Sequence, residues 1–367
     1  MQITKDEEKF TFLVDWKDET AGLIRSYLLT FFAVDGSLEL YDIKNKRTFL
    51  KRNITGEFSL EDFTIGLKFT ICSREMTVRE YGDSKTKMKM EIKKQRCCAV
   101  IKPDAFDSAG YIIERIQKEG LIIAQMRTFR FDEEKLTQFF GSLQDHPQFN
   151  NLIKSLCNDL LIGMDITGDM CIRRMWLLCG DETPEEAQKN EPESIRAKLG
   201  SNWVDNAMYI SLDETDAQKD LLFLFQNPHP PTSILSNCTL GLILPHIIKE
   251  GKLGQLLAHI QFEGFDISAV EQFYLDKGGS NEFLAVYHEV IRGYNTKVEE
   301  LCSGPCVAME IRGENVQKEF RDLCGPYDPS IAKQLFPKSI RAIFGESIIK
   351  NAIHCTDLPE DGVLEVM

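Results

Sequence analysis

A block of about 130 residues occurs twice in this chain, and this duplication restricts the fold more than any other feature of the sequence. The tetrapeptide Ser-Ile-Arg-Ala stands at 194–197 and again at 339–342, 145 positions later. At the same shift, Asn206 corresponds to Asn351. Two copies of one unit are expected to share one fold, and each copy can be interpreted by comparison with the other.

Both copies have the same order of predicted elements. A short apolar strand leads to an amphipathic helix, and then come an alternating strand, further helices, a buried strand, another helix, a long loop and a last short strand. The first strand and helix are expected at 97–101 and 111–118, and at 239–244 and 253–261. The strands are too short and too closely connected for a doubly wound parallel sheet. We therefore predict an α+β chain whose repeats are split βαβ, ferredoxin-like sheets covered by helices on one face.

The first ninety residues follow a different pattern and predict a small β domain. Asp35-Gly36 is typical of a hairpin turn between two of its strands. The strands are expected at 10–15, 27–32, 37–42, 48–52 and 68–73. We place the domains at 1–90, 91–227 and 237–367, with a lysine-rich linker at 84–96 and a Pro- and Ser-rich linker at 227–236.

Composition excludes several classes of partner and site. The net charge of −14 disfavours nucleic acid and anionic membranes, because the chain would repel their phosphates. We see no apolar stretch that predicts a membrane helix, and the charged start predicts no secretory signal. The 11 cysteines are scattered, which favours reduced thiols in the cytoplasm. No Cys-x-x-Cys spacing occurs, so we predict no structural metal site.

A loop that presents Arg341, Asn351 and His354 beside a short strand could hold a phosphate chain against an imidazole nucleophile. Phosphoryl transfer needs positive charge and hydrogen-bond donors around the phosphate oxygens. Neutral imidazole is a competent nucleophile when a carboxylate orients its other nitrogen. A single histidine beside a strand is more often structural, so this triplet by itself is a weak signal.

Taken together, the ordered motifs resemble those of the nucleoside diphosphate kinase family. They are Ile-Lys-Pro-Asp at 101–104, the helix after it, Ser-Ile-Arg-Ala in both copies and Asn-Ala-Ile-His at 351–354. The resemblance covers roughly 96–225 and 238–367. It implies the family's ferredoxin-like fold and transfer of a γ-phosphate between nucleotides through a phosphohistidine. It also implies Mg²⁺ on the phosphates of the nucleoside di- and triphosphates, and no P-loop motif is present.

In the second repeat, the resemblance makes His354 the nucleophile and Glu365 the carboxylate that orients it. The residues that it assigns to phosphate and nucleotide binding are Arg321, Arg341 and Asn351. Three positions depart from the family pattern: Leu244 replaces the phosphate-binding lysine, Tyr327 a threonine and His246 an aspartate. Because losing one transition-state donor costs roughly 10²–10³ in rate, we expect weak activity or none.

The first repeat departs in the opposite way. It keeps the nucleotide-binding residues Lys102, Arg196 and Asn206, but Tyr209 stands at the position of the nucleophile. A phenol, with a pKa of about 10, stays protonated near neutral pH and cannot replace an imidazole. Trp176 replaces an arginine, and Gln148 the base-stacking aromatic residue. The retained residues are either needed by the fold or bind nucleotide without turnover.

The segments 27–42, 45–52, 60–66 and 74–83 resemble the small, pleckstrin-homology-like β domain of doublet-microtubule proteins. This domain contains a basic cluster, which is either solvated or a docking patch for an acidic partner. The cluster consists of Lys44, Lys46, Arg47, Lys51 and Arg52.

Such a domain followed by two repeats is the architecture of one member of the family, and the resemblance spans nearly the whole chain. It implies a structural protein of the cytoskeleton, in the ciliary axoneme. Its partners would be tubulin, other microtubule inner proteins and the γ-tubulin complex. We favour this structural role over two alternatives, a weak phosphotransferase that uses His354 and a nucleotide-binding pseudoenzyme that uses Lys102 and Arg196.

Overall fold

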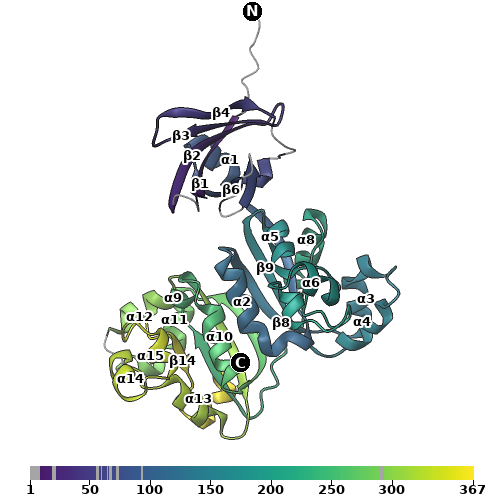
Figure 1. The fold of residues 1–367 in the computed structure, drawn as a ribbon. Helices are drawn as coiled ribbons and strands as arrows, with labels where there is room; N and C mark the ends of the chain where they lie inside the picture. Colours follow the sequence, from purple (N-terminus) through teal and green to yellow (C-terminus); the bar gives the residue numbers. More distant parts are fainter. Residues whose placement is uncertain are drawn as a thin grey trace, which may run out of the picture. The chain divides into compact units, whose positions relative to one another are not determined.

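The chain forms two compact units, residues 1–95 and 96–367 (Figure 1). The computed structural model describes residues 9–18, 22–54, 58, 60–63, 65, 68–71, 74–91, 94–289 and 293–367. Three sequence predictions fall partly outside these residues: the absence of a secretory signal, which rests on residues 1–8, the end of the strand expected at 68–73, and Thr64 and Gly66 of the N-terminal resemblance.

The N-terminal unit is the predicted β domain. Its strands are β1 (Lys9–Asp18), β2 (Leu23–Phe32), β3 (Ser37–Asp42), β4 (Arg47–Asn53), β5 (Lys68–Ile71) and β6 (Arg74–Tyr81). They form one antiparallel sheet in the order β4-β3-β2-β1-β6-β5. Alternate residues of β1, namely Phe10, Phe12 and Val14, point into the core, where Phe63 stacks against Phe12. The turn at Asp35-Gly36 joins β2 to β3 as predicted, with Gly36 at φ 70°.

The linker predicted at 84–96 is wrong over the residues that the structure describes, because Ser84–Glu91 form helix α1 and strand β7 begins at Lys94. Asp83 accepts a hydrogen bond from the backbone N–H of Thr86, and the hydroxyl of Thr86 accepts one from the N–H of Thr11 in β1. Met90 is buried in the core of the N-terminal unit. The many lysines of this helix made the segment look like a solvated linker in the sequence. A short helix needs few apolar residues to pack against a core, and here Met90 packs in this way.

The second unit contains both repeats in one eight-stranded sheet. Its strands are β7 (Lys94–Ile101), β8 (Ile122–Arg130), β9 (Leu160–Asp169), β10 (Met208–Ile210), β11 (Cys238–Ile243), β12 (Asp266–Tyr274), β13 (Pro305–Arg312) and β14 (Ile353–Cys355). The order is β10-β7-β9-β8-β12-β13-β11-β14. Within each repeat the fourth strand lies beside the first, then come the third and the second, which is the ferredoxin-like order. The predicted fold class is confirmed.

Both faces of this sheet are covered, so the prediction of helices on one face only is wrong. Cys97, Ala99 and Ile101 of β7 lie in the core cluster that includes residues of α2 (Ala109–Lys118) and α5 (Cys171–Cys179). Cys98 and Val100 point to the opposite face, where α3 (Glu133–Phe139) and α4 (Phe149–Leu156) cover them. A strand with apolar residues on both sides requires cover on both sides.

The two repeats are joined as an internal pseudo-dimer, a question that the sequence left open. Strand β8 pairs with β12, and Arg127 forms an ion pair with Glu271 across the junction. Helix α2 lies beside α10 (Leu253–Phe262), as Figure 1 shows. Gly110 and Gly254 bring the two helix backbones into contact, because a Cβ on either would lie 2.1 Å from a backbone nitrogen of the other helix.

The other helices connect the strands and build the loops around them. The α-helices are α6 (Pro184–Asn190), α7 (Ile195–Leu199), α8 (Glu214–Leu221), α9 (Pro245–Lys249), α11 (Lys277–Phe283), α12 (Tyr294–Leu301), α13 (Val316–Cys324), α14 (Pro329–Leu335), α15 (Ile340–Phe344) and α16 (Gly362–Val366). The shorter turns are η1 (Leu60–Phe63), η2 (Pro103–Ser108), η3 (Gly141–Leu143), η4 (Leu222–Gln226), η5 (Ala285–Tyr287) and η6 (Pro359–Asp361). Within the described residues, we find no helix with the length and apolar character needed to cross a membrane.

Candidate active site

His354 lies in the middle of β14, the three-residue strand at the edge of the second repeat's sheet. It pairs with Leu242 of β11. The strand follows Ala352, whose φ of 71° turns the chain sharply, and Ala207 has φ 70° at the equivalent place in the first repeat. The turn and the strand pairing fix the backbone of His354 and leave its side chain largely buried but accessible from a cavity.

The imidazole of His354 faces Glu365, as the sequence predicted. Nε2 of the ring lies 3.2 Å from Oε2 of Glu365, which α16 carries. The helix begins at Gly362, where a Cβ would lie 2.2 Å from the carbonyl oxygen of Cys238, so only glycine allows α16 to pack this closely on β11. When Nε2 carries the proton and donates a hydrogen bond to the carboxylate, Nδ1 carries the lone pair and is the nucleophilic nitrogen.

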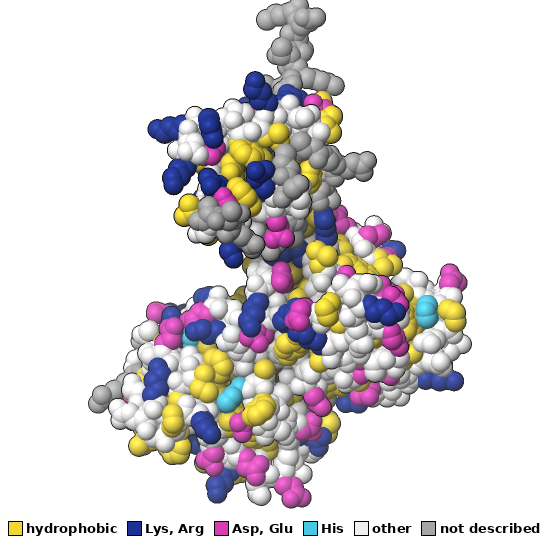
Figure 2. All heavy atoms as spheres, in the orientation of Figure 1, with side chains coloured by type: hydrophobic (Ala, Val, Ile, Leu, Met, Phe, Trp, Pro, Cys, Tyr) yellow, Lys and Arg dark blue, Asp and Glu magenta, His cyan; other side chains and the backbone are white. Residues whose placement is uncertain are grey.

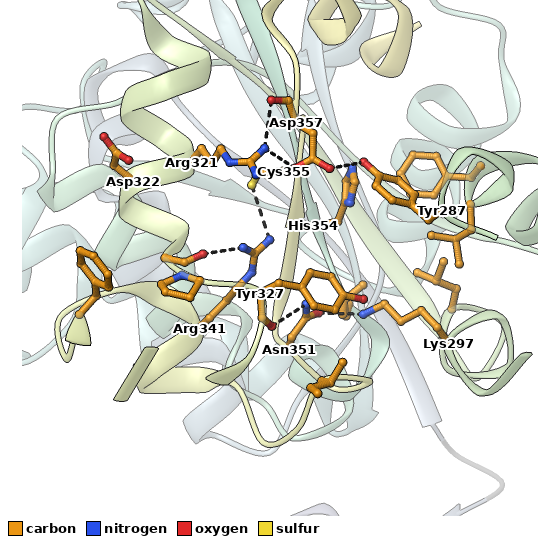
Figure 3. A pocket seen from close by; sticks show the side chains of 18 residues that line it. Tyr287, Lys297, Arg321, Asp322, Tyr327, Arg341, Asn351, His354, Cys355 and Asp357 are labelled. Carbon is orange, nitrogen blue, oxygen red and sulfur yellow. Dashed lines mark hydrogen bonds and ion pairs between the residues drawn. The ribbon is translucent and has the colours of Figure 1, made fainter. Parts of the chain in front are cut away.

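A cavity of about 650 Å³ opens beside His354 (Figure 3). Its volume lies in the range of small-molecule binding sites. The polar residues of its wall are His354, Tyr287, Lys297, Arg321, Asp322, Tyr327, Arg341, Asn351 and Asp357. The structure therefore brings His354 together with the three residues predicted to bind phosphate, and it adds Lys297, Asp322, Asp357 and Tyr287, which the sequence did not predict.

Arg341 reaches the cavity from α15 but uses most of its hydrogen-bond donors on the backbone. Nη1 donates to the carbonyl oxygen of Gly325 at 2.6 Å, and Nε and Nη2 donate to that of Ile353 at 3.2 and 3.1 Å. These bonds tie α15 to the strand that carries the nucleophile. Arg341 contributes a buried positive charge to the cavity and also holds β14 in place.

Arg321, on α13, is paired with a residue of the cavity wall. Its Nη1 donates to the carboxylate of Asp357 and, at 3.0 Å, to the carbonyl oxygen of the same residue. The hydroxyl of Tyr287 donates to the other carboxylate oxygen of Asp357 at 2.8 Å. Burial, together with Asp357, raises the pKa of Tyr287. A phosphate that approaches Arg321 must compete with Asp357 for its donors.

Lys297 is one of the residues that sequence reasoning missed. It lies on α12, and its Nζ donates to Oδ1 of Asn351 at 2.7 Å and to the carbonyl oxygen of Ile349 at 2.8 Å. The side chain is 3% exposed, and burial, followed by the charge of Arg341, lowers the pKa of Lys297 to about 7. No motif signals this lysine, because α12 lies far along the sequence from position 244, where the family's lysine was expected.

The first repeat holds its lysine and asparagine together in a similar way. Nζ of Lys102 donates to Oδ1 of Asn206 at 2.6 Å and to the carbonyl oxygen of Val204 at 2.9 Å. Burial lowers the pKa of Lys102 to about 8. Arg196 repeats the bonds of Arg341, with Nη1 on the carbonyl oxygen of Gly180 at 2.7 Å. The retained residues of the first repeat are thus held by contacts within the protein, an arrangement that both interpretations of their role include.

Tyr209 takes the place of the nucleophile in the first repeat, and it is a core residue. Its ring lies 5.6 Å from that of Phe139 and 5.2 Å from that of Phe140. Its hydroxyl donates to Asp220 at 2.9 Å, and burial raises the pKa of the phenol. A buried, protonated phenol among aromatic rings offers no lone pair of sufficient basicity for attack on phosphorus.

A second hollow, of about 600 Å³, lies on the first repeat, but its wall does not include Lys102, Arg196, Asn206 or Tyr209. His146 stacks on Trp203 there, with ring centroids 3.5 Å apart. Trp176 also lines it and donates from Nε1 to the carbonyl oxygen of Ser211 at 3.2 Å. The predicted residues of the first repeat are therefore near one another, but not around this opening.

The described residues contain no cluster of three or more His, Cys, Asp and Glu side chains that would hold a metal ion. Among the residues that line the 650 Å³ cavity, the carboxylates are Asp322 and Asp357. Mg²⁺ is commonly bound by one or two carboxylates together with the phosphates of a substrate. The cavity wall fits a Mg²⁺ ion that is held mainly by the phosphates of a bound nucleotide. The wall residues that the structure describes do not provide enough ligands to hold the ion by themselves.

Comparison with known proteins matches both repeats to one family. The family model described as nucleoside diphosphate kinase matches residues 95–229 and 237–367. The chain is 40% identical to nucleoside diphosphate kinase homolog 7 of Mus musculus over 98% of this chain and 92% of the relative, and the homolog of Rattus norvegicus gives the same values. Among solved structures, the nucleoside diphosphate kinase of Aquifex aeolicus is 30% identical, covers 36% of this chain and 95% of its own, and has a TM-score of 0.35.

Proposed function

Because the chain belongs to the nucleoside diphosphate kinase family, we propose that its second repeat binds a nucleoside di- or triphosphate and transfers a phosphoryl group through His354. The observation that carries this proposal is the contact between His354 and Glu365 beside a cavity lined with cations. A lone structural histidine would need neither the carboxylate nor the cavity. The first repeat, with Tyr209 buried in its core, performs no phosphohistidine chemistry.

In the proposed reaction, Nδ1 of His354 attacks the γ-phosphorus in line with the oxygen that links it to the β-phosphate. The N–P bond forms as this P–O bond breaks, and the nucleoside diphosphate leaves with the electron pair. Nε2 keeps its proton and donates a hydrogen bond to the carboxylate of Glu365, whose negative charge stabilises the positively charged ring. A second nucleoside diphosphate then takes the phosphoryl group from Nδ1 by the reverse steps.

The positive charges around the cavity bind and neutralise the phosphate chain of the nucleotide. Lys297, Arg321 and Arg341 line its wall and offset the negative charge that spreads over the phosphate oxygens in the transition state. Mg²⁺, when bound with the nucleotide, supplies further neutralisation of the same oxygens. Turnover should be slow, since Asp357 occupies donors of Arg321 and most donors of Arg341 are bound to the backbone.

Incubation with γ-labelled ATP tests this proposal. We expect acid-labile label on the wild-type chain, no label on His354→Ala, and full label on Tyr209→Phe, the matched change in the first repeat. Equal labelling of the wild type and His354→Ala, or no label on the wild type, would overturn the proposal.

A second function is favoured by the surface of the N-terminal unit. We propose that this unit docks the chain to an acidic surface of the ciliary axoneme, with tubulin, other microtubule inner proteins and the γ-tubulin complex as partners. Strand β4 is an edge strand, and all of its residues except Leu50 are exposed. Lysine and arginine side chains gather on this part of the unit (Figure 2). Arg52 is already held by Asp35 and lies 3.8 Å from the ring of Phe32, so Lys44, Lys46, Arg47 and Lys51 are the candidates for docking.

Co-sedimentation with microtubules and with axonemal doublets tests this role. We expect binding that weakens as salt is raised, and that is lost in a variant with Lys44, Lys46 and Lys51 changed to Glu. A variant with Lys154, Lys277 and Lys318 changed to Glu has the same net charge and should still bind. Absence of binding at every salt concentration, or equal loss in both variants, would contradict docking through this cluster.

A further inference from the structure

We propose that Lys297, on α12, is the nucleotide-binding lysine of the second repeat and that it replaces, from a different element, the lysine absent at position 244. This inference rests on the proposed function of the second repeat and assigns a binding role to a residue that the motifs of the chain do not identify. Its ligand would be the nucleotide that occupies the cavity beside His354.

The first step is that the two lysines donate to equivalent atoms. Lys102 contacts Oδ1 of Asn206 and the carbonyl oxygen of Val204. Lys297 contacts Oδ1 of Asn351 and the carbonyl oxygen of Ile349. Both pairs of acceptors are related by the repeat shift of 145, since 351 − 206 and 349 − 204 give the same number. The two ammonium groups therefore occupy the same place in the two repeats.

The second step is that the lysines reach this place from positions that are not equivalent. Lys102 precedes Pro103, and Leu244 precedes Pro245 at the matching position of the second repeat. Their backbones agree, with φ and ψ of −83° and 164° at Lys102 and −82° and 154° at Leu244. The backbone N–H of Lys102 donates to the carbonyl oxygen of Ala207, and that of Leu244 donates to the carbonyl oxygen of Ala352. These two acceptors are again 145 residues apart. The backbone at position 244 thus matches that at position 102, while the ammonium group of the second repeat comes from α12.

The third step concerns the cost of burying this charge. Both acceptors of Lys297 are neutral oxygens, and a buried ammonium that is not directly paired with a carboxylate is unfavourable. The negative charge of Glu300 favours the ammonium in part, but the Glu300 carboxylate bonds His246 and forms no ion pair with Lys297. Arg341 lies close enough to lower the pKa of Lys297 further. A negatively charged ligand in the cavity, which Lys297 lines, compensates for the buried charge.

The neighbouring aromatic ring supports the same assignment. Nζ of Lys297 lies 5.8 Å from the centroid of the Tyr327 ring, and Cζ of Arg341 lies 5.7 Å from it. Tyr327, which replaces a threonine of the family pattern, thus lies close to both cations (Figure 3). An aromatic face attracts cations, so the ring helps to keep two like charges at the wall of one cavity.

A charge-relocation series tests the proposal by calorimetric titration with a nucleoside diphosphate, which requires no chemistry. We expect Lys297→Leu to weaken binding by about 10²-fold, the upper end for the loss of one hydrogen bond between charged groups. The double variant Leu244→Lys/Lys297→Leu, which restores the arrangement of the first repeat, should bind within about tenfold of the wild type. Lys333→Leu is the control, because Lys333 bonds the carbonyl oxygen of Gly345 outside the cavity wall.

The outcomes separate this proposal from the proposed reaction. Wild-type affinity in Lys297→Leu overturns the assignment. If Lys297→Leu does not fold, the double variant decides: failure of the folded double variant to bind overturns the assignment too. A wild type that binds nucleotide but takes up no label overturns the reaction and leaves the role of Lys297 to be judged by affinity. A wild type that binds no nucleotide overturns both.

Discussion

His354 and Glu365 are eleven residues apart in the chain, and their side chains meet at 3.2 Å between Nε2 and Oε2. The contact joins an edge strand to the last helix, α16. The contact makes the two ring nitrogens different, because Nε2 faces the carboxylate and Nδ1 makes no such contact. In the proposed reaction, the same carboxylate would stabilise the positive ring that forms on phosphorylation.

Replacing Glu365 with Gln should slow phosphorylation of His354 by on the order of 10²-fold, because the amide carries no charge and does not favour the required tautomer. Nucleotide affinity should hardly change, since Glu365 does not line the cavity. The rate of label uptake at saturating ATP measures the effect. Glu360→Gln, an exposed change in η6, is the control, and a wild-type rate in Glu365→Gln would show that the carboxylate has no orienting role.

The affinity of the second repeat for nucleotide should fall as the pH rises above about 7. Burial places the pKa of Lys297 at about 7 in the free protein, and a bound phosphate chain favours the protonated ammonium. Binding above this pH must therefore take up a proton, and the affinity is lost as the proton becomes scarce. Calorimetry at about pH 8, in buffers of different ionisation enthalpy, measures this proton uptake.

Lys297→Leu should abolish the proton uptake, while Lys333→Leu should keep it. Uptake that persists in Lys297→Leu would show that another group titrates on binding.

The sign of the stability change follows from the same lowered pKa. Between about pH 7 and the ordinary lysine value, the unfolded chain binds more protons at Lys297 than the folded chain does, so this residue makes stability rise with pH in that window. Urea unfolding should show that the stability advantage of Lys297→Leu over the wild type, positive or negative near pH 7, falls towards pH 10. An advantage that is independent of pH would contradict the lowered pKa.

Alanine at Gly110 or Gly254 should destabilise the second unit by about 1–3 kcal/mol, as for other overpacked sites. Each added Cβ would lie 2.1 Å from a backbone nitrogen of the facing helix, so α2 and α10 would have to separate. Urea unfolding midpoints measure the change. Gly141→Ala is the control, because a Cβ added at Gly141 would meet no atom within 4 Å, and its effect should stay within about 0.5 kcal/mol.

Tyr209→Phe should cost about 1–2 kcal/mol of stability, since it removes a hydrogen bond from the buried carboxylate of Asp220. Asp220 keeps a second bond from the hydroxyl of Ser211 at 2.7 Å, which limits the loss. Tyr274→Phe, at a residue that is 69% exposed, should be nearly neutral. Equal unfolding midpoints for the two variants would contradict a structural role for the Tyr209 hydroxyl.

Much of the site was predictable because its residues belong to ordered motifs. Arg341, Asn351 and His354 lie within one stretch of fourteen residues, and the second Ser-Ile-Arg-Ala segment sets their order. Glu365 follows eleven residues after His354, and the chain turns back through η6 and α16 to bring it to the ring. The linker at 84–96 was wrong because the lysine pattern of α1 resembles that of a solvated segment. Among the residues of α1 whose burial is described, 84–90, only Thr86 and Met90 are buried.

The sequence by itself determined that the chain has two copies of one ferredoxin-like unit, that one copy keeps a histidine at the position of the family's nucleophile and that the other has a tyrosine there. Repeat spacing and motif order contain this information because equivalent residues keep their positions along the chain. Only the tertiary structure decided that the two sheets join through β8 and β12, and that Lys297 bonds the asparagine equivalent to the one that Lys102 bonds in the first repeat. The physical reason is that side chains from different elements can bring an ammonium group to equivalent points in space, which positions along the chain do not reveal.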